Sequence, residues 1–131
     1  MKYAAAIFAI LIVLLVLDIL WIKFVMGDVF RATLGETALQ TPRLFAASLF
    51  YALYVGGIFF LIVQPSTSST WTHTMLTAAL LGLMAYGTYD LTNMATLKLW
   101  SWKLVGIDMA WGTIVTTLSA LAGRRAMEWV R

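Results

Sequence analysis

The sequence contains no cysteine, and its single histidine, His73, has no partner at metal-ligand spacing. The lack of cysteine excludes disulfide bonds, thiolate nucleophiles and thiolate metal sites. Charged residues are scarce as well, because Asp, Glu, Lys and Arg make up only 11% of the chain. A soluble domain has roughly 25% charged residues, so this sequence cannot supply the water-facing surface of a soluble protein.

Hydrophobic residues, in contrast, make up 62% of the 131 residues. A helix that crosses a bilayer needs about 20 predominantly apolar residues. Four segments meet this requirement, namely residues 3–25, 44–63, 74–97 and 104–123. They leave too few residues for a separate soluble domain. The sequence thus predicts an all-α fold with one transmembrane domain over residues 1–131, an integral membrane four-helix bundle with short connections.

Short connections make neighbouring helices antiparallel. The longest connection, residues 26–43, is predicted to hold a short interfacial helix over 29–34 that Asp28 caps. Residues 98–103 alternate tryptophan with lysine, which is typical of a belt at the level of the lipid headgroups. Residues 124–131 are expected to form a charged tail. Lys and Arg are divided almost evenly between the two ends of the bundle, so the positive-inside rule gives no orientation.

Three of the six acidic residues interrupt the predicted spans: Asp18, Asp90 and Asp108. A carboxylate near the centre of a bilayer costs about 2.5–3.5 kcal/mol on insertion scales. A whole fold is typically worth only about 5–15 kcal/mol. Because these carboxylates are unfavourable in a membrane, we expect each of them to be paired or to take part in the function. They therefore indicate where a functional site would lie.

These aspartates also share a depth in the predicted bundle. Counted from the helix ends at about 1.5 Å per residue, all three fall roughly 6–11 Å below the same interface. Ser48 and Tyr51 of the second predicted helix fall at a similar level. The sequence therefore predicts a single polar layer across the four helices.

Helical spacing adds neighbours to the aspartates, because residues three or four apart stack on one side of a helix. An Asp-x-x-Trp pair occurs in both the first and the fourth predicted helix, and a tyrosine and an asparagine share a face with the aspartate of the third. Indole N–H and phenol O–H groups can donate to a carboxylate. The candidate ligand-binding or proton-relay residues are Asp18, Asp90, Asp108, Asn93, Tyr86, Trp21, Trp111, Tyr51 and Ser48.

Four short segments carry a resemblance to a known family. They read LDILW (17–21), LFY (49–51), YDLTN (89–93) and IDMAWGT (107–113). The chain resembles an uncharacterised bacterial family of small four-helix integral membrane proteins that is known only as a domain of unknown function. The resemblance implies four membrane spans and a multi-pass location in the cell inner membrane, and it implies no activity.

The predicted function is a pocket that binds or transports a proton-coupled, cationic or small amphipathic ligand. Intramembrane carboxylates serve proton relays and cationic groups, and aromatic rings beside them suit a cation. Four helices are few for alternating access, so a homodimer or a membrane-complex partner is expected besides the lipid bilayer. We predict no cofactor, no metal and no nucleic-acid partner for this function.

Two other functions stay open. The first is a membrane enzyme that acts on a lipid or isoprenoid-like substrate, with Asp90, Asn93 and Asp108 as acid, base or oxygen ligands of Mg²⁺. No recognised catalytic motif supports it. The second is an accessory structural subunit of a larger membrane complex, in which the aspartates only hold the helices together.

Overall fold

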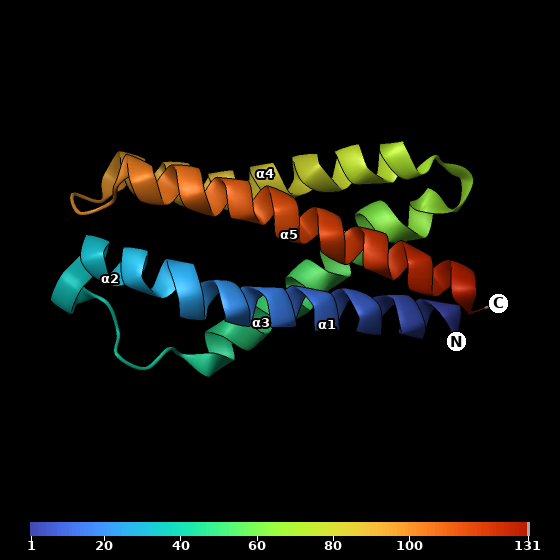
Figure 1. Cartoon of the computed structure of the whole chain (residues 1–131), viewed down its shortest axis with the longest axis horizontal. Coiled ribbons are helices and arrows are strands. Elements are labelled where there is room, and N and C mark those ends of the chain that lie inside the picture. The colour runs from blue at the N-terminus through green and yellow to red at the C-terminus, as the bar shows by residue number, and fades with distance from the viewer. Residues whose placement is uncertain (131) are drawn as a thin grey trace.

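The protein is described by a computed structural model that covers residues 1–130 (Figure 1). This part of the chain has helices and turns and no strand, so the predicted all-α class is confirmed. In chain order the α-helices are α1 (Lys2–Trp21), α2 (Gly27–Leu34), α3 (Leu44–Ile58), α4 (Trp71–Thr96) and α5 (Trp102–Trp129). Short π- and 3₁₀-helical pieces extend them, namely η1 (Ile22–Met26), η2 (Gly35–Thr37), η3 (Phe59–Val63) and η4 (Gln64–Ser68).

Three helical rods are long and apolar enough to cross a membrane: Lys2–Thr37, Leu44–Ser68 and Trp102–Trp129. Helix α4 has the position and length of the third predicted span, residues 74–97, but its threonine, tyrosine and asparagine residues make it less apolar. Two of its polar side chains, Thr74 and Asp90, are buried inside the protein. The bundle therefore consists of three apolar helices and a more polar one, of which these two polar side chains are covered by neighbouring elements while others, such as Thr88 and Thr92, are exposed.

The sequence predicts that the first span ends at residue 25, but the first of these helices continues beyond that residue. Helix α1 runs through the π-helical turn η1 directly into α2. Asp28 caps nothing, because the helix it was predicted to begin is a continuation with no free first turn. Its carboxylate lies 3.5 Å from the Arg31 guanidinium on the exposed surface. A π-helical turn inside an α-helix is frequently found at functional sites.

Helices α4 and α5 approach each other closely at two glycines. A Cβ atom on Gly82 of α4 would overlap the carbonyl group of Gly112 in α5. A Cβ atom on Gly112 would in turn overlap the ring of Tyr86. Small residues at these positions let the two backbones come together, and they leave the space that the Tyr86 ring occupies.

Helix α3 is packed unevenly. Its first turns stand apart from α4 and α5, whereas its C-terminal end and η3 enter the bundle (Figure 1). The side chain of Phe45 near its start is 83% exposed, while Ile58 and Val63 are fully buried. The apolar core thus lies where η3 meets α1 and α5, and α3 leaves the other end of the bundle less covered.

The predicted charged tail is wrong for its first residues, because α5 continues to Trp129. The Arg124 side chain is 5% exposed and stacks on the ring of Trp71, 4.4 Å from the ring centroid. Its guanidinium donates to the carbonyl oxygens of Ser69 and Thr70 ahead of α4 and also bonds Glu128. Residue 131 of the predicted tail lies outside the described residues.

Candidate functional site

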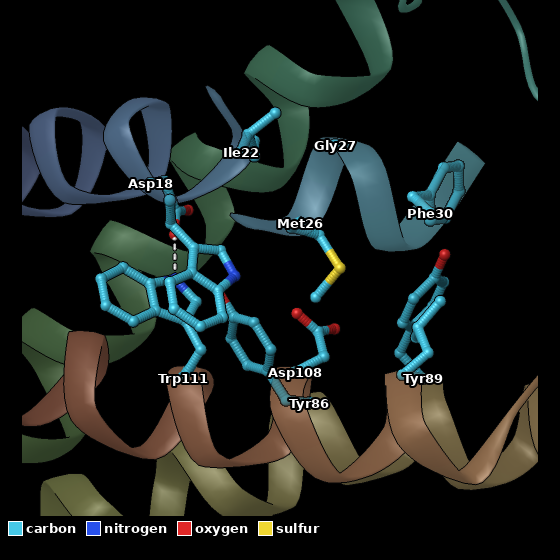
Figure 2. A pocket seen from close by; sticks show the side chains of 11 residues that line it. Asp18, Ile22, Met26, Gly27, Phe30, Tyr86, Tyr89, Asp108 and Trp111 are labelled. Atoms are coloured by element: carbon cyan, nitrogen blue, oxygen red, sulfur yellow. Dashed lines mark hydrogen bonds between the residues drawn. The ribbon is translucent and has the colours of Figure 1, made fainter. Parts of the chain in front are cut away.

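A cavity of about 300 Å³ lies between the α1–η1–α2 rod on one side and α4 and α5 on the other (Figure 2). Each of these elements contributes to its wall, including the π-helical turn through Ile22 and Met26. The lining is mostly apolar and aromatic, with two carboxyl groups, those of Asp18 and Asp108. The cavity therefore combines the features expected of a small-molecule site, an apolar surface with few polar groups.

Asp18 is held by hydrogen bonds from two other helices. The Tyr51 hydroxyl of α3 donates to Oδ2 at 2.8 Å, and the Trp111 indole N–H of α5 donates to Oδ1 at 2.8 Å. The residue is only 6% exposed. Hydrogen bonds to an ionised group are stronger than those between neutral groups, so this carboxylate joins α1, α3 and α5 beside the cavity.

Trp111 also forms the flat wall of the cavity together with Trp21. The two rings are parallel within 3°, and their centroids are 4.4 Å apart. Because its N–H is bonded to Asp18, the Trp111 ring is fixed both in position and in rotation. The tryptophans of the two Asp-x-x-Trp pairs of the sequence thus stack on each other.

Asp108 differs from Asp18 in its surroundings. Its side chain is half-buried, and its carboxyl group points into the cavity toward the thioether of Met26 (Figure 2). The rings of Tyr86 and Tyr89 line the same space. Asp108 is therefore the acidic group that a molecule in the cavity would meet, whereas the oxygens of Asp18 are occupied by Tyr51 and Trp111.

Asp90 lies behind Asp108 and does not line the cavity. It is 0% exposed, and within residues 1–130 neither carboxyl oxygen has a hydrogen-bond partner. Its polar neighbours are Asp108 and Trp100, whose indole N–H is likewise buried and makes no hydrogen bond of standard geometry in the described part of the chain. The three aspartates thus lie close together, with one bonded, one facing the cavity and one enclosed.

The structure brings most of the sequence-predicted residues to this place, but not all. Tyr86 lines the cavity, and its ring packs near that of Tyr54, with centroids 6.2 Å apart. Ser48 is exposed on α3 in the half that stands away from the bundle, and it lines neither this cavity nor the second one described below. Asn93 is half-buried on α4 and does not contribute to the cavity wall.

Several residues of the site were not predicted. Tyr89, Phe30 and Met26 line the cavity although only their neighbours had been singled out. Trp100 belongs to the predicted headgroup belt, yet it is 5% exposed and packs on Leu104 beside Asp90, while Trp102 of the same belt is 68% exposed. A signal for Tyr89 exists in the sequence, because it follows Tyr86 at helical spacing on the same face.

A second cavity, of about 400 Å³, lies on the other side of the same residues. Phe50 of α3 and Ala85 of α4 line it, together with Tyr86, Tyr89 and Asp108. Its lining is also mostly apolar. The two cavities therefore share three side chains, and Asp108 is the acidic one among them.

The described residues include no group of three or more His, Asp or Glu side chains close enough to hold a metal ion. The enzyme hypothesis names Asp90, Asn93 and Asp108 as acid, base or Mg²⁺ ligands, and of these Asp90 and Asn93 line neither cavity. Within the described residues, no further acidic or histidine side chain lies close enough to Asp90 and Asp108 to bind a Mg²⁺ ion together with them.

Comparison with known proteins gives one match. The family model described as "Predicted membrane protein (DUF2177)" matches residues 3–125. No curated protein and no solved structure matches the chain. The matched region contains all the residues that line the cavity, and its apolar helices would sit in a lipid bilayer.

Proposed function

Because the chain belongs to the DUF2177 family of predicted membrane proteins, which is defined by sequence and not by an activity, we propose a function from its cavity. The protein binds a small organic cation inside the membrane, with the positive group against Asp108. Binding at this carboxyl group is the first step of transport across the bilayer. The inner membrane of a bacterial cell and a homodimeric assembly are part of the same proposal.

The observation that carries this proposal is the contrast between Asp18 and Asp108. The oxygens of Asp18 accept hydrogen bonds from Tyr51 and Trp111, whereas the Asp108 carboxyl points into an apolar space (Figure 2). A charge in apolar surroundings is unfavourable unless it is paired. An organic cation in the cavity would pair with this carboxyl group, and the cavity of about 300 Å³ is at the lower end of the usual size of ligand pockets.

The aromatic rings around Asp108 favour binding of a cation over binding of a neutral ligand. Tyr86, Tyr89 and Trp111 all line the cavity, and the negative faces of such rings attract positive groups within about 6 Å. The bond from Trp111 to Asp18 keeps one of these rings in place before any ligand arrives. A site that is organised in advance loses less free energy on binding.

The same arrangement would couple the cation to a proton. When the cation leaves, the Asp108 carboxyl can take up a proton in its place, so that the two occupants exclude each other. Asp90, enclosed directly behind, would keep the pair from carrying two negative charges in the absence of a ligand. Exchange of one positive occupant for the other is the elementary step of a proton-coupled carrier.

The test is binding of benzyltrimethylammonium to the full chain in lipid nanodiscs, measured by isothermal titration calorimetry with empty nanodiscs subtracted. We expect Asp108→Asn to lower the affinity at least tenfold, and Asp28→Asn, at an exposed carboxylate, to leave it unchanged. Neopentylbenzene, which has carbon in place of the charged nitrogen, should not distinguish the variant from the parent protein. Absence of binding, or equal binding by the Asp108→Asn variant, would refute the proposal.

A further inference from the structure

The second cavity shares part of its wall with the first, including Asp108. Tyr86 and Tyr89, which are three residues apart on α4, line both spaces together with Asp108. A positive group at the Asp108 carboxyl would therefore have the first cavity on one side and the second cavity on the other. Among the described residues, Asp108 and the two tyrosines are the ones with polar side chains that line the second cavity.

The second cavity also opens in an unusual direction. It lies between α4 and the part of α3 that stands away from the bundle, where Phe50 lines it. The side chains around Phe50 on α3, Leu49 and Leu53, are apolar and exposed. In a bilayer such a surface faces hydrocarbon and not water, so a molecule would reach this cavity sideways from the membrane.

We infer that the ligand is a single-chain ammonium amphiphile, whose charged headgroup lies at Asp108 and whose hydrocarbon chain lies in the second cavity between α3 and α4. This inference rests on the proposed function and names its substrate class. The three side chains that the two cavities share, with Asp108 among them, argue for one molecule that occupies both. Volumes of about 300 Å³ and about 400 Å³ suit a headgroup and a chain, respectively.

The length of the ligand's hydrocarbon chain is the property that tests this inference. Burial of one methylene group from water is worth a factor of about four in affinity. We therefore expect the affinity for n-alkyltrimethylammonium ions to rise from the butyl to the decyl compound by up to this factor per methylene. The measurement uses calorimetry of the full chain in nanodiscs, with titrations of empty nanodiscs subtracted to remove partition of the ligands into lipid.

Ala85 offers the decisive variant, because it lines the second cavity and not the first. Ala85→Trp should fill the space for the chain, so that butyltrimethylammonium still binds while the gain with chain length is lost. Leu83→Trp is the matched control on the exposed side of the same helix and should behave like the parent protein. Ala85→Leu, a smaller change, is expected to reduce the gain in part and serves if the tryptophan variant does not fold.

The outcomes separate the two proposals. If butyltrimethylammonium binds and Asp108→Asn abolishes that binding, but Ala85→Trp keeps the dependence on chain length, only the assignment of the second cavity is overturned. If no ammonium ion binds, the proposed function itself fails. Efficient disulfide cross-linking of an Ala85→Cys variant to a second copy would also overturn the assignment, because the chain has no other cysteine and a neighbour would then occupy the groove.

Discussion

The indole N–H of Trp111 donates a hydrogen bond of 2.8 Å to Asp18, which joins the middle of α5 to the last turn of α1. This single contact links a buried carboxylate to the ring that forms a wall of the cavity. It also explains how an acidic residue can be kept in an apolar helix, because Tyr51 supplies a second donor from α3. The contact therefore has a role in stability as well as in shaping the site.

Trp111→Phe keeps an aromatic ring against Trp21 but removes the donor to Asp18. A hydrogen bond to a charged group contributes about 1.5–3 kcal/mol, and we expect a loss of free energy of unfolding of this size. Equilibrium unfolding followed by circular dichroism measures it, with Trp102→Phe as the control at an exposed ring. In a double-mutant cycle with Asp18→Asn the two losses should not add. Additive losses would show that the two side chains do not interact as described.

Asp90→Asn distinguishes a structural from a functional aspartate. Both oxygens of Asp90 are buried, and neither makes a hydrogen bond of standard geometry to another helix in the described residues. An isosteric amide at this position avoids the cost of a second buried acidic group, and we expect the thermal midpoint to stay unchanged or to rise. Differential scanning calorimetry of the protein in nanodiscs measures it. A fall of several degrees would instead support the hypothesis that the aspartates merely hold the helices together.

The meeting of three aspartates is a feature that the sequence indicates well, because the rise per residue of a helix fixes the depth of each side chain. The rotation of each helix about its axis is not fixed in this way. Ser48 and Tyr51 lie one turn apart on α3, yet Tyr51 bonds Asp18 while Ser48 is exposed. The difference arises from how α3 diverges from the bundle, which depends on packing of η3 at its other end.

Helix ends are equally hard to read in this chain. The sequence predicts that the first span ends at residue 25 and that Asp28 caps a new helix, but η1 joins α1 to α2 without a break. Trp100 belongs to a segment whose composition is typical of a headgroup belt, but the turn after α4 places its side chain inside the protein beside Asp90. In both cases contacts between residues far apart in the sequence override a local pattern that has more than one structural outcome.

Gly112→Ala tests whether the position of Tyr86 depends on the close approach of α4 and α5. The added Cβ atom would overlap the Tyr86 ring, and forcing extra volume into a packed site typically costs about 1–3 kcal/mol. Gly106→Ala on the same helix meets no atom within 4 Å and should stabilise the helix by about 0.5–1 kcal/mol. Chemical unfolding of both variants gives the comparison. Equal effects would mean that the Tyr86 ring moves aside freely and is not held by this glycine.

Arg124→Gln tests the contact that closes the opposite end of the bundle from the cavities. The Arg124 guanidinium donates to the carbonyl oxygens of Ser69 and Thr70 and to the Thr74 hydroxyl, so it connects α5 to the start of α4. Glutamine is too short and has too few donors to replace it, and we expect a loss of at least about 2 kcal/mol in the free energy of unfolding, since hydrogen bonds from a charged group contribute about 1.5–3 kcal/mol each.

The adjacent Arg125 provides the control for this variant, because its side chain is exposed. Arg125→Gln removes the same charge from the same turn of α5, and substitutions on an open surface usually change stability by no more than about 0.5 kcal/mol. Ammonium binding at Asp108 should survive in both variants, since Arg124 lines neither cavity. If Arg124→Gln were as stable as Arg125→Gln, the guanidinium would not hold the two helices together, and its burial would reflect packing on Trp71 alone.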